Sequence, residues 1–218
     1  MIDGVIFDLD GVLVQTEQVW DEVRRQLVRD RGGCWHQRAH LDMMGMSSPE
    51  WSRYMHDRLG LVEPPEEISA EVVRRLSSRY AEWLPLMPGA AHAVERLSAR
   101  WPLAIASSSN RDLIDLVLRL SGLALFFTVT VSSEEVKRGK PAPDVYLEAA
   151  RRLGLDPAKA AAVEDSHSGI LSAHAAGMRV IAIPNRAFPP GEEATAAAAL
   201  VLQSLAELTP ETVEPPAI

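Results

Sequence analysis

The stretch VIFDLDG, residues 5–11, places two carboxylates directly behind a short apolar run. Its first three residues are branched or aromatic, which is typical of a strand buried on both faces. Asp8 and Asp10 are two positions apart, so on an extended backbone their side chains start on the same side. Carboxylates this close repel each other unless a cation lies beside them. The stretch therefore predicts a strand that ends at a cation site.

The segment behind this strand has helical periodicity. Apolar residues recur at helical spacing with charges between them, and no convincing strand interrupts them. We predict an all-helical unit over residues 15–85, inserted after the first strand. Its helices are expected from Thr16 to Gly32-Gly33, from Ser48-Pro49 to Gly60, and from Ser69, a candidate N-cap, to Tyr80.

After Pro88-Gly89 short apolar runs alternate with helical patterns. This alternation predicts a mostly parallel sheet with helices on both faces, a doubly wound α/β core built from residues 1–14 and 86–218. The expected strands are 103–106, 127–131, 161–163, 180–183 and 200–202, and the expected helices are 90–99, 112–120, 143–153, 168–176 and a weak one at the end.

Polar side chains follow several of these strands. In an open α/β sheet, ligands bind outside the carboxyl ends of the strands. Glu164 and Asp165 end one predicted strand, and Asp8 and Asp10 end another. Mg²⁺ prefers oxygen ligands and keeps several waters. We therefore predict a magnesium site built from Asp8, Glu164 and Asp165, with the backbone carbonyl of Asp10. The alternatives are a calcium loop, which lacks its further acids, and carboxylates that only cap turns.

Phosphate-compatible groups follow the other strand ends. Ser107, Ser108, Ser109 and Asn110 combine hydroxyls with successive backbone N–H groups at a helix start, which favours an anion. A helix N-cap is the competing explanation of Ser109 and Asn110. Lys140 lies between Gly139 and Pro141 and could neutralise a phosphoryl group, although a single lysine is usually a solvated surface residue.

Four motifs occur in a fixed order: DLDGV (8–12), ASSSN (106–110), KPAPDVY (140–146) and VEDSHSGI (163–170). Together they resemble the four motifs of the haloacid dehalogenase superfamily, in its phosphatase and phosphomutase branch with a helical cap. The resemblance covers nearly the whole chain. It implies a Rossmann-like core, and a cap that closes over the site and selects the substrate.

The resemblance also implies roles for individual residues. Asp8 would attack phosphorus and carry an aspartyl phosphate, while Asp10 would move the proton in both steps. Ser107 and Lys140 would hold the phosphoryl oxygens, with Mg²⁺ screening the charges. Ser108 and Asn110 are the candidate substrate contacts. The expected activity is Mg²⁺-dependent hydrolysis of a small phosphorylated metabolite, such as a sugar phosphate.

Three alternatives remain beside this hypothesis. A dehalogenase is disfavoured because those relatives lack the acid at Asp10. An intramolecular phosphomutase of the β-phosphoglucomutase type would carry a histidine where this chain has Trp20, and an arginine after its Gly45-Met46-Ser47 stretch, where Ser48 stands. A non-catalytic phosphate-ester binding module is disfavoured because the motif residues are all present. Gln15 also departs from the Asp that relatives usually have at the cap entrance.

Charge and composition limit the partners. The formal net charge of −8 leaves no excess of basic residues for nucleic acid. One cysteine, Cys34, excludes an internal disulfide, and no apolar run reaches the length of a membrane span. We therefore expect a cytoplasmic protein, a monomer or small homo-oligomer, that binds neither membranes nor nucleic acid.

Overall fold

The computed structural model describes residues 1–185 and 188–214. Its centre is a six-stranded sheet in the order β3-β2-β1-β4-β5-β6, and every neighbouring pair in it is parallel. The predicted doubly wound α/β fold is thereby confirmed. The strands are β1 (Gly4–Phe7), β2 (Leu103–Ser107), β3 (Phe127–Ser132), β4 (Ala160–Glu164), β5 (Arg179–Ala182) and β6 (Leu200–Val201).

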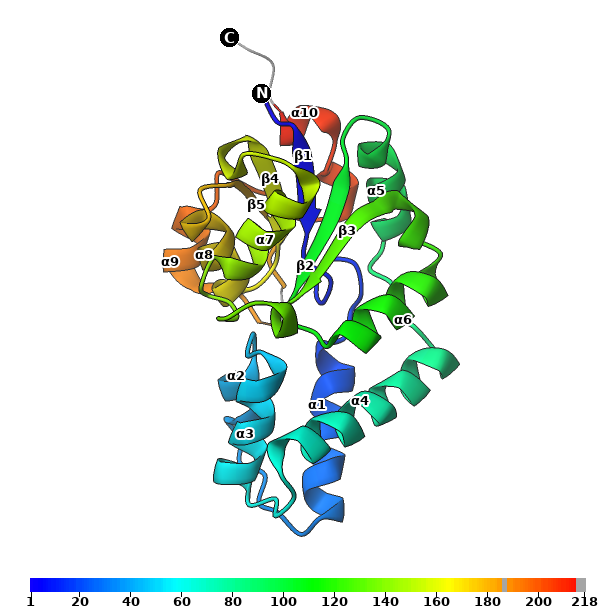
Figure 1. Cartoon of the computed structure of the whole chain (residues 1–218), viewed down its shortest axis with the longest axis vertical. Coiled ribbons are helices and arrows are strands. Elements are labelled where there is room, and N and C mark those ends of the chain that lie inside the picture. The colour runs from blue at the N-terminus through cyan, green and yellow to red at the C-terminus, as the bar shows by residue number, and fades with distance from the viewer. Residues whose placement is uncertain (186–187, 215–218) are drawn as a thin grey trace.

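Helices cover both faces of this sheet (Figure 1). One buried cluster joins Ile6 of β1 to α7 and α8, and a second joins Val5 and Phe7 to α5 and α6 on the opposite face. The alternation along β1 therefore sends its side chains into two separate cores. The core helices are α5 (Ala90–Ser98), α6 (Arg111–Ser121), α7 (Asp144–Leu153), α8 (His167–Ala175), α9 (Gly191–Ala197) and α10 (Pro210–Val213).

Four further helices form a separate group at the lower end of the molecule in Figure 1, and we call them the cap. They are α1 (Glu17–Asp30), α2 (Ala39–Met43), α3 (Ser48–Leu59) and α4 (Pro65–Glu82). The cap is joined to the core by two strand-like segments that lie side by side. The amide of Gln15 donates to Pro85 O at 2.7 Å, and the amide of Met87 donates to Leu13 O at 2.9 Å.

The predicted start of the last cap helix was wrong. Ser69 lies inside α4, which begins at Pro65 with Pro64 before it. Proline is well suited to the first helical position, because its missing N–H is one that a helix leaves unpaired there. The Pro64-Pro65 pair therefore opens the helix that it was expected only to precede. The short helix α2 had no predicted counterpart of its own.

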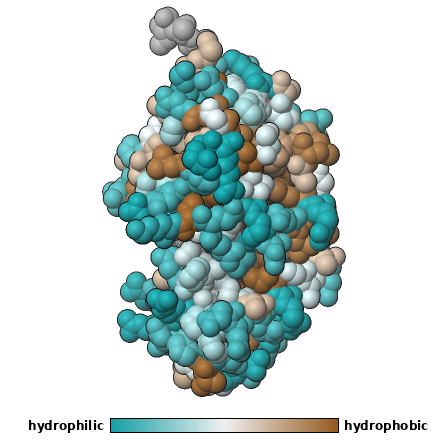
Figure 2. Space-filling view, in the orientation of Figure 1, coloured by the Kyte–Doolittle hydropathy of each residue, from teal (hydrophilic) through white to brown (hydrophobic). Residues whose placement is uncertain are grey.

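The surface facing the viewer is largely hydrophilic over the cap (Figure 2). Within residues 1–185 and 188–214, no helix is both long enough and apolar enough to cross a membrane.

Candidate active site

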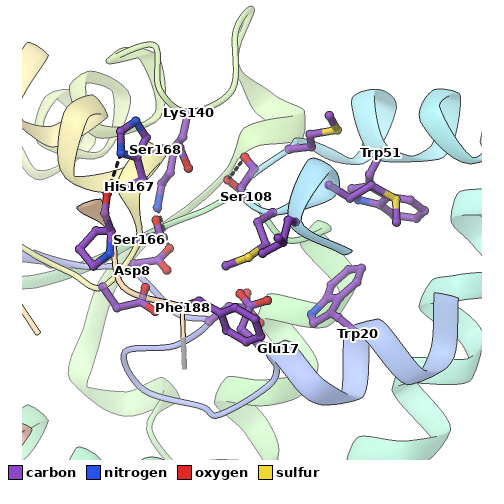
Figure 3. A pocket seen from close by; sticks show the side chains of 18 of the residues that line it. Asp8, Glu17, Trp20, Trp51, Ser108, Lys140, Ser166, His167, Ser168 and Phe188 are labelled. Carbon is purple, nitrogen blue, oxygen red and sulfur yellow. Dashed lines mark hydrogen bonds and ion pairs between the residues drawn. The ribbon is translucent and has the colours of Figure 1, made fainter. Parts of the chain in front are cut away.

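The sheet order brings the predicted functional residues together. Because β1 lies between β2 and β4, the residues after these three strands meet at one edge of the sheet. Asp8 follows β1, Asp165 follows β4, and Lys140 approaches from the segment before α7. Figure 3 shows Asp8 and Lys140 at the same end of one cavity, which Asp10, Ser108 and Asp165 also line.

Lys140 joins two carboxylates at the centre of this site. Its Nζ donates to Asp8 Oδ1 at 2.7 Å and to Glu164 Oε1 at 2.6 Å, and all three side chains are buried. Burial lowers the pKa of Lys140, but the two carboxylates more than offset this and raise it above its ordinary value. Lys140 is therefore a fixed positive charge beside Asp8.

Asp8 itself is under opposing influences. Burial raises its pKa, Lys140 lowers it, and the nearby Glu164 and Asp10 raise it, so that the pKa of Asp8 rises overall from 3.8 to about 8. In the protein alone the lysine is thus not enough to restore the ordinary acidity of Asp8. A further positive charge beside it would favour the ionised, nucleophilic form.

Glu164 is held from five sides. Besides Lys140, the Tyr146 hydroxyl donates to Oε1 at 2.9 Å, and the Asp165 amide donates to Oε2 at 2.9 Å. The Ser166 amide and hydroxyl each donate to Oε2 at 3.1 Å. Gly169 packs so closely that a Cβ atom there would overlap the carboxylate. Glu164 therefore fixes Lys140 and the first turn of α8 in position.

Asp10 is oriented by hydroxyl groups from two parts of the chain. Thr16 donates to Oδ1 at 2.5 Å, and Ser109 donates to Oδ2 at 2.6 Å. Ser107 lies farther from Oδ2, at 3.4 Å. With both carboxylate oxygens engaged, Asp10 has a defined direction beside Asp8, as a proton carrier requires.

The serine run after β2 divides among different tasks. Ser107 is fully buried, and its hydroxyl accepts from the Ser109 amide at 3.0 Å. Ser108 lines the cavity and lies 3.4 Å from Gly45 O in the cap. A helix N-cap was the competing explanation of Ser109. In the structure Asn110 is the residue directly before α6, and Ser109 orients Asp10 instead.

Asn110 lies away from the reacting groups. Its Nδ2 donates to Glu134 Oε1 at 2.7 Å and to Ser69 Oγ at 3.3 Å. It lines a second cavity between α4 and α6, whereas Ser108 and Ser109 line the first. The structure therefore does not bring Asn110 to the other predicted substrate contacts, because Glu134 turns its side chain toward the cap.

The acidic residues fit a divalent ion. Asp8, Glu164 and Asp165 each offer a carboxylate oxygen within 4.8 Å of the others, and all three are buried. Oδ1 of Asp165 is buried without a hydrogen-bond partner among the described residues. Burial raises the pKa of Asp165 well above its ordinary value, and Glu164 and Asp8 add to the effect. Oxygen ligands of this kind and density suit Mg²⁺.

The cap supplies the other end of the same cavity, whose volume is about 440 Å³. Figure 3 shows Trp20 and Trp51 opposite Asp8 and Lys140, with Glu17 and Phe188 between the two ends. Glu17 and Arg24 on α1 also line it. Neither residue stands out in the sequence alone, although they lie seven positions apart on the helix that carries Trp20, a spacing that places them on one face.

The cap lies directly against the core at this cavity. Gly45 has a positive φ of 74°, and a Cβ atom there would overlap the Ser168 hydroxyl at the start of α8. At a second contact between core and cap, a Cβ atom on Gly139 would come within 3.0 Å of the Ser47 Cβ. Two glycines thus permit the close approach, one from each side.

A family model for haloacid dehalogenase-like hydrolases matches residues 2–177. A phosphorylated carbohydrates phosphatase from Thermotoga maritima is 33% identical over 182 residues, which cover 83% of this chain and 84% of that protein. The bifunctional riboflavin kinase/FMN phosphatase of Arabidopsis thaliana is 34% identical over 183 residues, and the chain spans 48% of its length. The crystal structure of CbbY from Rhodobacter sphaeroides in complex with phosphate matches with a TM-score of 0.86 and 28% identity, covering 95% of this chain and 96% of that one.

Proposed function

Because the chain belongs to the haloacid dehalogenase-like hydrolase family, and to the phosphoric monoester hydrolases within it, we propose that it hydrolyses a small phosphate monoester with Mg²⁺ through an aspartyl phosphate. The observation that carries the proposal is the pairing of Asp8 with Lys140 at 2.7 Å, beside an independently oriented Asp10. The cavity size favours a small metabolite such as a sugar phosphate.

In the first step, a carboxylate oxygen of Asp8 attacks phosphorus, and the bond from phosphorus to the ester oxygen breaks. Lys140 donates to Asp8 and offsets negative charge where the phosphoryl group arrives. Asp10, held by Thr16 and Ser109, gives its proton to the departing ester oxygen. The products of this step are the free alcohol and an Asp8 phosphoryl anhydride.

In the second step, Asp10 accepts a proton from a water molecule, whose oxygen attacks phosphorus. The bond from phosphorus to Asp8 breaks, which returns Asp8 to its carboxylate form and releases inorganic phosphate. Ser108 and Lys140 line the cavity where the phosphoryl group would lie. The cap excludes other water during the first step.

The residues that would hold Mg²⁺ are Asp8, Asp165 and Glu164 through their carboxylates and Asp10 through its backbone carbonyl. When bound, the ion supplies positive charge that favours ionised Asp8 and offsets the charge of the phosphoryl group. Glu164 also accepts hydrogen bonds from Lys140 and from the Ser166 amide before α8. The same carboxylate would therefore hold both the ion and these two groups.

The cap favours hydrolysis over the phosphomutase alternative. Trp20 lines the cavity at the position where β-phosphoglucomutases carry a histidine, and an indole cannot exchange protons with a sugar hydroxyl. Ser48, where those enzymes have an arginine, is buried. Neither residue carries the positive charge with which an arginine at that position would hold a second phosphoryl group.

A panel of phosphate monoesters, assayed after chelation and again with added Mg²⁺, tests the proposal. We expect phosphate release that depends on Mg²⁺ and is lost in Asp8→Asn. The absence of phosphate release from every ester of a broad panel would refute the proposal, as would full activity of Asp8→Asn. Sugar phosphates that isomerise with little free phosphate would identify a mutase, and tight binding without turnover would identify a binding module.

A further inference from the structure

The cap end of the cavity contains a buried guanidinium group without an ionic partner. Arg24 on α1 is 7% exposed, and its Cζ lies 4.4 Å from the ring centroid of Trp20 and 4.7 Å from that of Trp51. Among the described residues, its Nε has no hydrogen-bond acceptor, and no carboxylate lies within 4.0 Å of the guanidinium. The two indole rings contact each other edge to face, at 5.8 Å and 72°, so they lie on one side of the guanidinium and leave its Nε–H without an acceptor.

Glu17 lies two helical turns earlier on the same face and lines the same cavity. Its nearest ionic neighbour among the described residues is His40, whose Nε2 lies 4.0 Å from Glu17 Oε2. The cavity wall therefore presents carboxyl oxygens, which accept hydrogen bonds, and a guanidinium, which only donates them. The two are not paired with each other.

The chemistry of a matching ligand follows from these two groups. An alkyl chain would leave both unpaired inside a buried cavity, which is unfavourable. A second anionic group would meet the one charge of Arg24 but would also meet Glu17, with Asp21 nearby on the same helix. A hydroxyl group both donates and accepts, so neighbouring hydroxyls satisfy Glu17 and Arg24 together.

We propose that Arg24 and Glu17 bind neighbouring hydroxyl groups of the leaving alcohol, which makes Arg24 a specificity-determining residue for polyol phosphates over alkyl phosphates and bisphosphates. The inference rests on the proposed phosphatase function. In the proposed binding arrangement, the Trp20 indole packs against the carbon chain of the polyol, and Asp8 meets the phosphoryl group at the opposite end of the cavity.

Matched substrates and variants test this role. The substrates are sorbitol 6-phosphate, n-hexyl phosphate and fructose 1,6-bisphosphate, each assayed with Mg²⁺ in the whole protein. For Arg24→Gln we expect kcat/KM on sorbitol 6-phosphate to fall by about 10- to 100-fold, mainly through KM, because a hydrogen bond to a charged group is lost. On n-hexyl phosphate we expect less than a threefold change.

The control variant is Arg25→Gln on the same helix. Arg25 is exposed, pairs with Asp21 at 2.7 Å and is not part of the cavity wall. We expect Arg25→Gln to leave kcat/KM unchanged on both sorbitol 6-phosphate and n-hexyl phosphate. Glu17→Leu removes the acceptor instead of the donor and should reproduce the selective loss, so the test does not depend on the folding of Arg24→Gln.

Specific outcomes would overturn the inference. Equal losses on the polyol and alkyl esters in both variants would show that Arg24 and Glu17 only support the cap. Wild-type protein that hydrolyses n-hexyl phosphate or the bisphosphate as efficiently as sorbitol 6-phosphate would refute the specificity and leave the phosphatase function intact. If no ester released phosphate, the proposed function would fail with it.

Discussion

The hydroxyl of Ser109 donates to Asp10 Oδ2 at 2.6 Å, although 99 positions separate the two residues in the chain. Thr16 holds the other oxygen of the same carboxylate at 2.5 Å. The direction of Asp10 is therefore set jointly by the start of the cap and by the loop after β2. Any motion of the cap that moves Thr16 also acts on Asp10, the group that we propose carries the proton.

Ser109→Ala should lower kcat about tenfold with little change in KM, because Asp10 loses one of its two short hydrogen bonds and its orientation. Thermal stability should change little, since a hydrogen bond contributes about 1 kcal/mol. Steady-state kinetics on the best substrate provide the measurement, with Ser78→Ala, an exposed serine on α4, as the control. An unchanged kcat in Ser109→Ala would mean that Thr16 alone orients Asp10.

Glu164→Gln should reduce the free energy of unfolding by about 3 kcal/mol, because breaking a buried ion pair leaves Lys140 without one of its carboxylates. The amide nitrogen of the new side chain would also face a hydrogen-bond donor, whichever of the two carboxylate oxygens it replaces. Urea unfolding followed by circular dichroism measures this loss. Repeating the urea unfolding with Mg²⁺ tests whether the ion stabilises wild type more than the variant. A midpoint equal to that of wild type would contradict the structural role assigned to Glu164.

Gly169→Ala should destabilise the protein by about 2 kcal/mol, through overpacking against the Glu164 carboxylate. This is opposite in sign to the usual effect, because alanine favours a helix over glycine by about 1 kcal/mol. Urea unfolding of Gly169→Ala and of His174→Ala, an exposed position on α8, gives the comparison. A Gly169→Ala protein as stable as wild type would show that the carboxylate can move aside without cost.

Glu17→Gln should make stability less sensitive to pH. Burial and Asp10 raise the pKa of Glu17 and Arg24 lowers it, so that the pKa rises overall from 4.5 to about 7. The folded protein therefore keeps this proton at pH values where the unfolded chain has lost it, so wild-type stability falls as pH rises from about 4.5 to 7. With a side chain that is 23% exposed, we expect Glu17→Gln to be more stable than wild type by about 1–2 kcal/mol at pH 8 and equal to it at pH 4.

Urea unfolding across this pH range, in metal-free buffer, provides the measurement. Glu22→Gln changes an exposed residue on the same helix and serves as the control. If the curves of Glu17→Gln and Glu22→Gln coincided from pH 4 to pH 8, Glu17 would not be a destabilising group in the fold.

The sheet and its reacting end were predictable because their signals are local. Each of β1, β2 and β4 is a continuous apolar run that ends in polar residues, and parallel strands bring those ends to one edge. Asp8 and Asp165 follow directly from that rule. Lys140 needed the family motif as well, because nothing in its own neighbours distinguishes it from a surface lysine.

The cap side of the site could not be predicted in the same way. Which face of α1 meets the core depends on how four helices pack, and Arg24 lies beside the apolar stripe that packs them. Asn110 and Ser109 show a related limit. Both follow β2, yet Glu134 draws one side chain away and Asp10 holds the other, and these contacts join residues far apart in the chain.

The two segments that connect cap and core cross at a single covalent point of attachment. Residues 13–15 and 85–87 are hydrogen-bonded to each other, so the chain leaves the core and returns to it at nearly the same place. We therefore expect the whole helical insert to be exchangeable for another of different sequence, provided that it starts and ends at this paired crossing and keeps the Thr16 hydroxyl that orients Asp10. Such a chimera would keep the register of the sheet and the reacting carboxylates while acquiring a different substrate preference. In evolutionary terms, selectivity can then change by replacing one cassette, without any alteration to the catalytic chemistry.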